Sequence, residues 1–516
     1  MQPAIIATSK AGADTRLAAR GYAGKELILP RNHIRFLYCT LLAFLAVRLA
    51  AMVTLPFTDT TESRYAEMAR KMVETGNWLT PQDGYGVPFW GKPPLNTWLS
   101  AGGMEAFGVN EFAARLPILL SSLAILALVY VWTRSVAGRN IALVSVLVLF
   151  STVAFFGASA FVMTDIPMAL GTTLVMVGFW SAVCRAAPDR IWGYAVFLGL
   201  AIGMLAKGPV AVVICLIPLM IWLAVRREWS LLGRLPWLRG GAALLALTLP
   251  WYAAAEWATP GFLRYFLIGE HIERFLVPGW AGDLYGGGHD EAKGMIWIFW
   301  TGTIRPWSYV ALVPLIWKAR SGIRAVRSDT SGWMLYLFLW AISPMILFTF
   351  ASNILPAYTI PGLPASAVLM VVLYTHLWPD APGKWRRALF VGSAGVSLAF
   401  FAAVAILASA APDMLGLKTH KALVAEAEVQ VPGAPLYRIG QRSFSSEYYT
   451  GGKVRLVPLD ALADLNAGAE AGPGMGNPVA LSVPDRYVDD VEALGYRRIG
   501  VFGRGNTLFV SGAAAQ

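Results

Sequence analysis

The first polar segment of the chain, residues 58–113, carries side chains suited to acid–base chemistry and to binding anions. Asp59, Glu62 and Arg64 stand near its start, and Lys92 follows later, directly before two prolines. A carboxylate can serve as a general base, and a fixed cation can stabilise negative charge that develops on a reacting group. The prolines stiffen the chain beside Lys92, so this lysine is the first candidate for such a cation.

Further ionisable residues stand at the ends of long apolar runs. Asp165 lies between the third and fourth runs, and Lys207 lies in the turn between the fifth and sixth. The long connection after the seventh run adds three more: Glu270, His271 and Arg274. Charged groups at membrane depth are costly and usually face a cavity or one another. We therefore expect these residues to share one extracytoplasmic site with the first polar segment.

Each of these residues also has a structural interpretation. Asp165 could cap the helix that follows it, and Lys207 could extend its amine to the membrane surface. His271 taken alone is typical of a structural histidine. The helical spacing of four charged residues predicts an amphipathic helix on the membrane surface with a solvated face: Glu67, Arg70, Lys71 and Glu74.

The composition identifies a polytopic membrane protein. Hydrophobic residues make up 56% of the 516 residues and charged residues only 14%, with 20 Trp and 25 Phe. A soluble globule of this size needs more polar surface, and a disordered chain needs fewer apolar residues. The net charge of +11 does not indicate nucleic-acid binding, because most Lys and Arg lie in short segments between apolar runs.

Eleven apolar runs are long enough to be membrane spans. With the N-terminus inside, the inner connections contain 21 Lys and Arg and the outer ones contain 8, which favours this orientation. The prediction is a mainly α, polytopic helical bundle of about 11–13 spans, with amphipathic helices in its outer loops. The runs are residues 36–57, 114–132, 140–161, 166–184, 191–206, 209–225, 240–256, 294–317, 333–350, 357–378 and 388–411.

Three domains are expected: a cytoplasmic arm over 1–35, a transmembrane domain over 36–411 with 58–113 as its first outer loop, and an extracytoplasmic domain over 412–516. The last contains no membrane-length apolar run. Short β-rich runs and one helical stretch predict a small α/β domain there. The expected strands are Pro435–Ile439, Val454–Val457, Val479–Val483, Arg498–Phe502 and Thr507–Val510, with a helix over Val488–Leu494 and a loop over Gly468–Asn477.

Several motifs in order resemble a known family. They are Arg64-Tyr65-Ala66-Glu67, Gly76-Asn77-Trp78-Leu79-Thr80-Pro81, Lys92-Pro93-Pro94-Leu95, Phe107 to Pro117, Thr164-Asp165, Ala206-Lys207-Gly208, Glu270-His271 with Arg274, and Ile354 to Pro361. On these motifs residues 36–375 resemble the GT-C glycosyltransferases of the lipid A aminoarabinose transferase type, which are related to protein O-mannosyltransferases.

The resemblance implies an inverting enzyme of the bacterial inner membrane with its active site on the periplasmic face. Such an enzyme moves a sugar from a polyprenyl phosphate donor, of the undecaprenyl type, to lipid A, lipopolysaccharide or another glycan. Contact with membrane lipids is expected, and binding of nucleic acid is not. The sugar and the acceptor stay open.

The resemblance also assigns roles to the candidate residues. The phosphate leaving group needs positive charge and no protonating acid, which points to Lys92, Arg64, Lys207 and Arg274. Asp59, Glu62 and Asp165 are the candidates for catalysis, because a hydroxyl acceptor would need a general base. Substrate contacts are expected from Tyr65, Glu270, His271 and Tyr358.

This chain departs from the family pattern at three positions. The usual Asp-Glu pair reads Thr61-Glu62 here, with Asp59 two residues earlier, so the key carboxylate is either Asp59 or Glu62. Gly91 replaces a glutamate that could bind a metal, so no cofactor is required and a divalent metal stays an open alternative. Asn353 replaces a lysine.

Other functions compete with this hypothesis. A protein O-mannosyltransferase-like enzyme differs only in its acceptor, and a polymerase or ligase of surface glycans shares the lipid-linked donor. A secondary transporter of lipid-linked or small substrates is the alternative from another class. A transporter typically has internal repeats and ionisable groups in mid-span, whereas this sequence has no detectable repeat and concentrates its charges in the outer loops.

Overall fold

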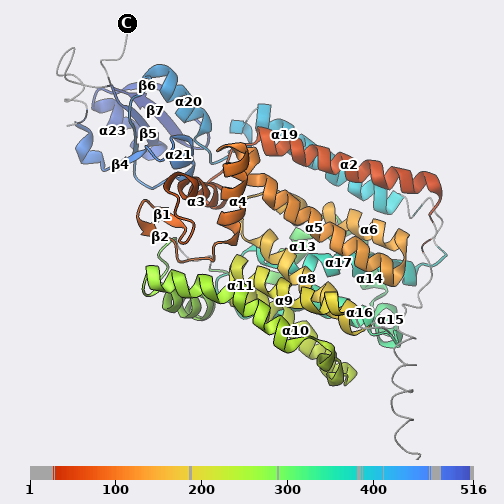
Figure 1. Cartoon of the computed structure of the whole chain (residues 1–516). Coiled ribbons are helices and arrows are strands. Elements are labelled where there is room, and N and C mark those ends of the chain that lie inside the picture. Colours follow the sequence, from red (N-terminus) through yellow and green to blue (C-terminus); the bar gives the residue numbers. More distant parts are fainter. Residues whose placement is uncertain are drawn as a thin grey trace, which may run out of the picture. The chain divides into compact units, whose positions relative to one another are not determined.

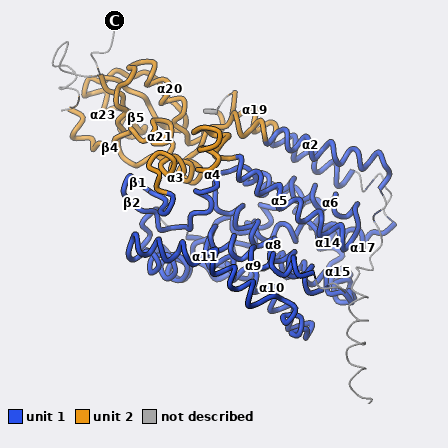
Figure 2. Tube along the Cα trace, in the orientation of Figure 1, with its two compact units in different colours: residues 1–48, 78–99, 116–401 blue, residues 49–77, 100–115, 402–516 orange. Residues whose placement is uncertain are grey.

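The computed structural model describes residues 27, 29–184, 189–286, 290–380, 385, 388–410, 412–463, 465 and 478–511. Most of the expected cytoplasmic arm and the expected loop Gly468–Asn477 lie outside these residues. The chain divides into two compact units (Figure 2), and each is described by itself. Unit 1 comprises residues 1–48, 78–99 and 116–401, and unit 2 comprises 49–77, 100–115 and 402–516.

All eleven predicted apolar runs fall on helical segments, which confirms the mainly α architecture (Figure 1). The helices are α2 (Arg31–Thr54), α5 (Glu111–Ala137), α6 (Arg139–Phe150), α7 (Val153–Ala158), α8 (Asp165–Val183), α9 (Arg190–Lys207), α10 (Pro209–Arg226), α11 (Trp237–Ala258), α13 (Met295–Thr303), η3 (Ser308–Leu312), α14 (Val313–Trp317), α16 (Trp333–Phe348), η4 (Pro356–Gly362), α17 (Leu363–Leu377), η5 (Ala388–Gly392) and α19 (Ser393–Ala410).

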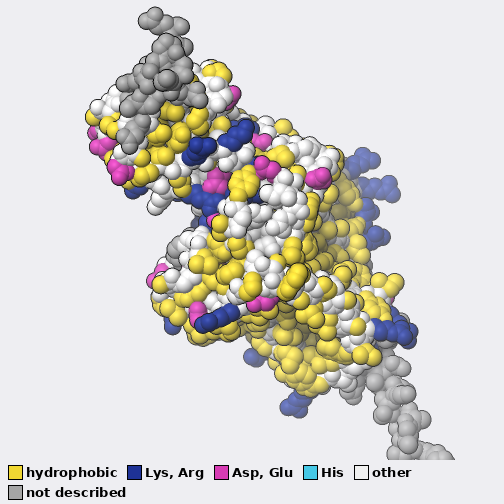
Figure 3. Space-filling view, turned by 60° about the vertical axis from the view of Figure 1, so that its left-hand side comes forward, with side chains coloured by type: hydrophobic (Ala, Val, Ile, Leu, Met, Phe, Trp, Pro, Cys, Tyr) yellow, Lys and Arg dark blue, Asp and Glu magenta, His cyan; other side chains and the backbone are white. Residues whose placement is uncertain are grey.

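Within the described residues, seven helical segments are long and apolar enough to cross a membrane, and three shorter apolar helices accompany them. Large apolar side chains such as Leu42, Leu120 and Leu198 are exposed on these helices. Figure 3 shows hydrophobic side chains over much of one face of the molecule, with Lys and Arg gathered in patches. Such an apolar exterior is stable only against lipid, so the chain is a multi-span membrane protein.

The connections of unit 1 contain shorter elements. A two-stranded hairpin joins β1 (Gln82–Gly84) to β2 (Val87–Pro88). After α11 the chain forms a π-helical segment, η2 (Arg264–Glu273), followed by a single turn, α12 (Arg274–Leu276). The amphipathic helix α15 (Ala319–Ser328) precedes α16.

The tightest helix pair of unit 1 is α8 with α9, and glycines allow it. A Cβ atom on Gly171 would come within 2.6 Å of the backbone oxygen of Gly199, and one on Gly199 would meet the backbone of Gly171 at the same distance. Small residues permit this close approach of helices in membranes. Because the two helices form an antiparallel hairpin, the first residue of α8, Asp165, lies beside the last residue of α9, Lys207.

Unit 2 combines the start of the first outer segment with the C-terminal domain. Its helices are α3 (Thr61–Thr75), α20 (Lys421–Gln430), α21 (Phe444–Tyr449) and α23 (Val488–Ala493), and α4 (Leu95–Phe107) begins in unit 1 and continues into it. The expected α/β fold of the C-terminal domain is confirmed. Each of the five predicted strands is present: β3 (Leu436–Ile439), β4 (Arg455–Val457), β5 (Ala480–Pro484), β6 (Arg497–Phe502) and β7 (Asn506–Val510).

The five strands form one mixed sheet in the order β4-β3-β5-β7-β6. Strand β3 is parallel to both β4 and β5, and β7 is antiparallel to β5 and β6. Alternate residues of β5 and β7 enter two separate cores, as the two-residue period of a strand requires. Leu481 and Phe509 pack in the core that includes Val491 of α23, whereas Ala480 and Leu508 pack in the core that includes Leu423 of α20.

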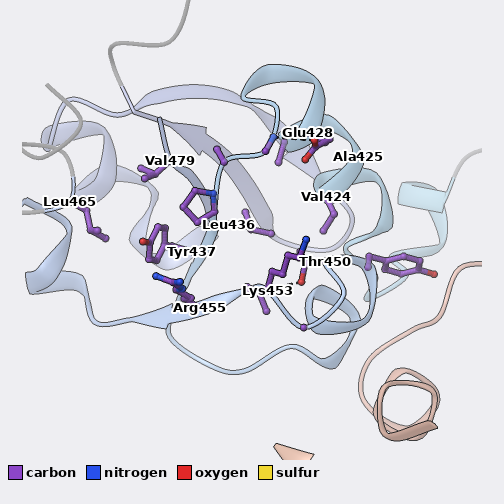
Figure 4. Close-up of a pocket in the computed structure, with 17 residues that line it drawn as sticks. Val424, Ala425, Glu428, Leu436, Tyr437, Thr450, Lys453, Arg455, Leu465 and Val479 are labelled. Atoms are coloured by element: carbon purple, nitrogen blue, oxygen red, sulfur yellow. Dashed lines mark hydrogen bonds between the residues drawn. The ribbon is translucent and has the colours of Figure 1, made fainter. Parts of the chain in front are cut away.

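A cavity of about 1090 Å³ lies in this domain between α20, the start of β3 and the segment leading into β4 (Figure 4). Its ionisable lining groups, Glu428, Lys453 and Arg455, are exposed. None of the residues predicted for the site lines it.

Candidate active site

Seven of the predicted site residues lie together in unit 1. A cavity of about 80 Å³ is lined by six of them, Lys92, Lys207, Glu270, His271, Arg274 and Tyr358, and the seventh, Asp165, pairs with Lys207. Five separate segments supply these residues: the chain before α4, the start of α8, the end of α9, the η2–α12 segment and η4. The structure therefore brings these seven dispersed residues together.

Lys207 and Asp165 form a buried ion pair with 2.5 Å between Nζ and Oδ1. Only 9% and 8% of their side chains are exposed, so Lys207 does not extend to the membrane surface. Asp165 is not the cap of α8, because Thr164 holds that position. The Lys207 ammonium also lies 4.6 Å from the centroid of the Tyr358 ring, where the π-face attracts a cation.

The turn after Lys207 requires glycine. Gly208 has a φ of +87°, and a Cβ atom there would lie 2.5 Å from the ring of Phe266 and 3.2 Å from Cε1 of His271. Any side chain at this position would therefore push η2 away from the end of α9. Gly208 thus keeps Lys207 next to the segment that carries Glu270 and His271.

Glu270 links two cations at the cavity. One of its oxygens lies 2.7 Å from Lys92 Nζ, and the other lies 3.0 Å from Arg274 Nη1. Burial alone would raise the pKa of Glu270, but the charges of Lys92 and Arg274 outweigh burial and hold its pKa below the usual value. Glu270 is therefore ionised at neutral pH and anchors both cations.

Arg274 has a second carboxylate partner that the sequence did not indicate. Asp283 Oδ2 lies 3.3 Å from Arg274 Nη1. Burial disfavours the charged form of Arg274. The negative charges of Glu270 and Asp283 outweigh burial, so the pKa of Arg274 is raised above its usual value. Asp283 lies in a segment without a motif, so only the folded chain identifies it.

His271 is neutral at pH 7. Its Nδ1 lies 2.7 Å from the backbone oxygen of Phe266 and must donate a proton to it, because a carbonyl oxygen only accepts. Burial is the main cause that lowers the pKa of His271, and the nearby charge of Lys92 lowers it further.

Asn353 also lines the cavity, at the position where the family pattern has lysine. Its Nδ2 donates to the backbone oxygen of Arg274 at 2.7 Å and so fixes the turn that carries this arginine. Its Oδ1 is buried and has no hydrogen-bond partner among the described residues. The sequence analysis identified Asn353 as a departure from the family pattern but did not predict it as a site residue.

The other four predicted residues, Asp59, Glu62, Arg64 and Tyr65, lie in unit 2 and make contacts within it. Asp59 accepts hydrogen bonds from the Oγ atoms of Ser63 at 2.5 Å and Ser443 at 2.6 Å, and from the backbone N–H of Ser445 at 2.9 Å. The C-terminal domain thus supplies two of these three donors, which gives Asp59 a structural role beside the predicted catalytic one.

Glu62 is buried in a bidentate ion pair. Arg115 donates Nε and Nη2 to the two carboxylate oxygens, each at 2.8 Å. Arg115 also donates to the backbone oxygens of Met52 and Leu55 and lies over the ring of Phe57. Such a pair fixes the start of α3 against the start of α5.

Arg64 and Tyr65 follow Glu62 in α3. The guanidinium of Arg64 lies 4.8 Å from the ring centroid of Phe444, and Tyr65 is half-buried. Arg64 therefore contacts the C-terminal domain within unit 2.

The expected solvated face of α3 is wrong for Glu67, Arg70 and Lys71 and holds only for Glu74, which is exposed. Glu67 and Lys71 are 0% and 1% exposed, and Arg70 is 7% exposed. Glu67 pairs with Arg70 at 2.7 Å, and Lys71 pairs with Glu447 of α21 at 3.0 Å. The helix is amphipathic as predicted, but its charged residues pack against the C-terminal domain because Glu447 supplies a partner 376 residues away.

No group of three or more His, Cys, Asp or Glu side chains that could hold a metal ion occurs within the described ranges. In that part of the chain the carboxylates near the cavity are each engaged by a cation: Asp165 by Lys207, Glu270 by Lys92 and Arg274, and Asp283 by Arg274. Three cations and three carboxylates thus balance over the cluster, but the cavity lining includes all three cations and only one carboxylate, Glu270.

Comparisons with known proteins show which family and fold the chain resembles. Residues 35–266 match the model of the dolichyl-phosphate-mannose-protein mannosyltransferase family. The chain is 32% identical over 349 residues to the undecaprenyl phosphate-alpha-4-amino-4-deoxy-L-arabinose arabinosyl transferase of Edwardsiella ictaluri, covering 65% of this chain and 59% of that protein. The enzyme of the same name from Erwinia tasmaniensis is 30% identical over 380 residues, 71% of this chain and 63% of that protein.

The chain spans about three fifths of the length of these curated relatives. Among solved structures, ArnT from Cupriavidus metallidurans bound to undecaprenyl phosphate superposes with a TM-score of 0.74 at 20% identity, covering 92% of this chain and 98% of that one. An archaeal oligosaccharyltransferase, AglB from Archaeoglobus fulgidus, gives a TM-score of 0.50 at 13% identity, covering 88% and 69%. At these identities the likeness concerns the fold.

Proposed function

We propose that this chain, an integral-membrane protein of the GT-C type related to lipid A aminoarabinose transferases and protein O-mannosyltransferases, is an inverting glycosyltransferase. It moves a sugar from a polyprenyl phosphate donor to lipid A or another lipopolysaccharide acceptor. The reaction takes place at the periplasmic face of the bacterial inner membrane.

The observation that carries this proposal is the charge of the cavity in unit 1. Four ionised side chains line it, the cations Lys92, Lys207 and Arg274 and the single carboxylate Glu270. The lining that a ligand meets therefore has three cations and one carboxylate, while Asp165 and Asp283, which pair with Lys207 and Arg274 but do not line the cavity, balance the charge of the cluster as a whole. A polyprenyl phosphate sugar is a phosphodiester with one negative charge, and its leaving group carries a second. The cavity thus favours the charge that develops as the glycosidic bond breaks.

The geometry suggests a division of labour among the cations. Lys92 and Arg274 are joined by Glu270 and held in fixed positions, so they bind the phosphate with little reorganisation. Lys207 is held by Asp165, and its ammonium faces Tyr358. Tyr358, His271 and the unpaired Oδ1 of Asn353 are the polar groups left to contact the sugar.

The base for a hydroxyl acceptor is a separate question. Glu270 is engaged by Lys92 and Arg274, which hold its pKa below the usual value, and Asp165 is held in an ion pair with Lys207. Asp59 is half-buried and accepts hydrogen bonds only from neutral donors among the described residues, so it stays the leading candidate for general base. A phosphate acceptor, already anionic, would need no base.

The names of the relatives support the donor. The curated relatives are named as arabinosyl transferases that act with undecaprenyl phosphate-linked aminoarabinose, and the ArnT structure contains undecaprenyl phosphate. The family match to protein mannosyltransferases supports the alternative of a protein acceptor. Both alternatives share the lipid-linked donor and the cationic cavity.

An assay on the purified full chain in detergent tests the proposal. A panel of polyprenyl phosphate sugars is incubated with lipid A or with an acceptor protein, and products are detected by mass. We expect a gain of one sugar mass on an acceptor, lost in Lys92→Ala and kept in the control Lys293→Ala, which alters an exposed lysine of the outer segment before α13. No sugar transfer from any donor of the panel to any acceptor would contradict the proposal.

A further inference from the structure

Helix α15 (Ala319–Ser328) separates apolar from basic residues along its length. Ala319, Gly322, Ile323 and Val326 recur at the spacing of one helical face. Three arginines come directly after Ala319, Ile323 and Val326 and therefore recur at helical spacing themselves: Arg320, Arg324 and Arg327. A short helix of this kind lies in the plane of a membrane surface, with its apolar face toward the acyl chains.

The apolar face of α15 borders a groove of about 410 Å³ within unit 1. Helices α13, α14, α16 and α17 contribute the other walls through apolar side chains such as Leu315, Phe338 and Leu373. The ionisable residue in the lining is Arg327. The groove is therefore lined by apolar side chains along its length and by the basic side chain of Arg327 at one edge.

The three arginines are exposed and make no ion pair within the described residues. The neighbouring residues mark the depth at which they lie. Trp317 is 86% exposed, and Lys318 donates to the backbone oxygen of Leu377 while its ammonium lies 4.5 Å from the ring centroid of Trp378. Tryptophan and lysine gather at the headgroup level of membranes, so the arginines face that layer.

Segment 318–332 belongs to the positively charged set of connections, which places it at the inner leaflet. We propose that α15 and the groove form a binding site for an acidic phospholipid of the inner leaflet. One acyl chain lies in the apolar groove, and the headgroup phosphate lies against Arg320, Arg324 and Arg327. A zwitterionic lipid would fill the groove equally well but would leave the three arginines uncompensated, so the charge pattern selects an acidic headgroup.

Native mass spectrometry of the delipidated full chain tests this site. The probes are phosphatidylglycerol and phosphatidylcholine, added separately and in competition. We expect the wild type to retain phosphatidylglycerol in preference. The triple variant Arg320→Gln, Arg324→Gln, Arg327→Gln should lose on the order of 100-fold in phosphatidylglycerol affinity, because each arginine near the surface contributes about 1 kcal/mol. Its phosphatidylcholine binding should not change.

A matched control variant removes three positive charges from other inner connections of the chain. Arg190, Arg227 and Arg239 are exposed arginines of other inner connections, and their replacement by Gln should leave the lipid preference intact. A second variant, Gly322→Phe, keeps the arginines and fills the groove. The nearest side-chain atom to a Cβ at this position, Leu377 Cδ1, is 4.0 Å away, so the added side chain has room to enter. This variant should lose both lipids.

Equal retention of phosphatidylglycerol by the wild type and the triple variant would overturn the proposal, as would a wild type without headgroup preference. Displacement of phosphatidylglycerol by equimolar polyprenyl phosphate, abolished in the triple variant, would overturn it too, because the groove would then hold the donor. Lipid retention is measured without sugar transfer, so the result does not depend on the enzymatic proposal.

Discussion

The ion pair between Lys207 and Asp165 joins the end of one membrane helix to the start of the preceding one, with 2.5 Å between Nζ and Oδ1. Both side chains are buried, and the Lys207 ammonium also faces the ring of Tyr358. The glycine contacts between α8 and α9 bring the two residues together, and Gly208 directs the chain away immediately afterwards. The pair therefore connects helix packing to the charge of the cavity.

Breaking this pair should cost stability. Either Asp165→Asn or Lys207→Gln leaves one buried charge without its partner, and such changes destabilise by about 3–5 kcal/mol. The double variant removes both charges and should be more stable than the sum of the single effects predicts, with a coupling energy of about 1–3 kcal/mol. Thermal unfolding of the four proteins in one detergent measures this cycle. Additive effects would show that the pair is not energetically coupled.

Glu270 should control how the cavity holds the donor. Glu270→Gln keeps the shape of the side chain but removes the charge that anchors Lys92 and Arg274. We expect at least a tenfold fall in kcat/KM for the donor, because the two cations lose their fixed positions. Glu273→Gln, three residues away and exposed, is the matched control and should behave as the wild type. Equal activity of both variants would remove Glu270 from the site.

The two carboxylates of the first polar segment should respond differently. Glu62→Gln leaves Arg115, which is 4% exposed, without its bidentate partner and should destabilise unit 2 by about 3–5 kcal/mol. Asp59→Asn keeps an oxygen that can accept hydrogen bonds but removes a negative charge near the buried Arg438, so we expect a smaller loss of stability than for Glu62→Gln and a loss of sugar transfer if Asp59 is the base. Ser443→Ala serves as its control.

That control removes one donor to Asp59 and leaves the carboxylate in place. Ser443→Ala should cost about 1 kcal/mol of stability and retain most of the activity. Loss of stability without loss of activity in Asp59→Asn would instead assign Asp59 a purely structural role, and a hydroxyl acceptor would then need a different base.

Unit 2 should lose stability in mild acid because of His420. Burial, reinforced by the charge of Arg438, lowers the pKa of His420 from its usual value near 6.5 to about 4. Between these values the unfolded chain binds a proton that the folded chain does not, so the free energy of unfolding falls as pH decreases from about 6.5 to about 4. Thermal unfolding of His420→Gln should depend less on pH over this range. An unchanged slope would show that His420 does not contribute.

Much of the architecture follows from local sequence patterns. The apolar runs predicted the helices, and the five β-rich runs predicted the strands of the C-terminal domain, because hydrophobic periodicity is a local signal. The break between the predicted runs 333–350 and 357–378 is also present, with α16 before it and η4 with α17 after it. The sequence also predicted that the residues around the cavity lie together, because the outer connections that carry them were expected on the same side of the membrane.

What the sequence could not predict depends on pairing over long distances. Lys71 is buried because Glu447 supplies its partner from the C-terminal domain, and nothing near Lys71 in the sequence reveals this. Asp283 reaches the cavity region from a segment without an informative motif, and Asn353, noted in the sequence only as a departure from the family pattern, lines the cavity. The hydrogen bonds between Asp59 and Ser443 connect residues 384 positions apart, so the structural role of Asp59 was likewise invisible.

The most direct test of the enzymatic account is binding of the lipid-linked phosphate itself. Native mass spectrometry of the full chain with undecaprenyl phosphate should detect one retained lipid in the wild type and in Lys293→Ala. The double variant Lys92→Ala, Arg274→Ala removes two of the three cations that line the cavity, and we expect it to lose at least tenfold in affinity. Equal retention by the double variant would contradict the account, since the cavity charge would then have no part in holding the donor.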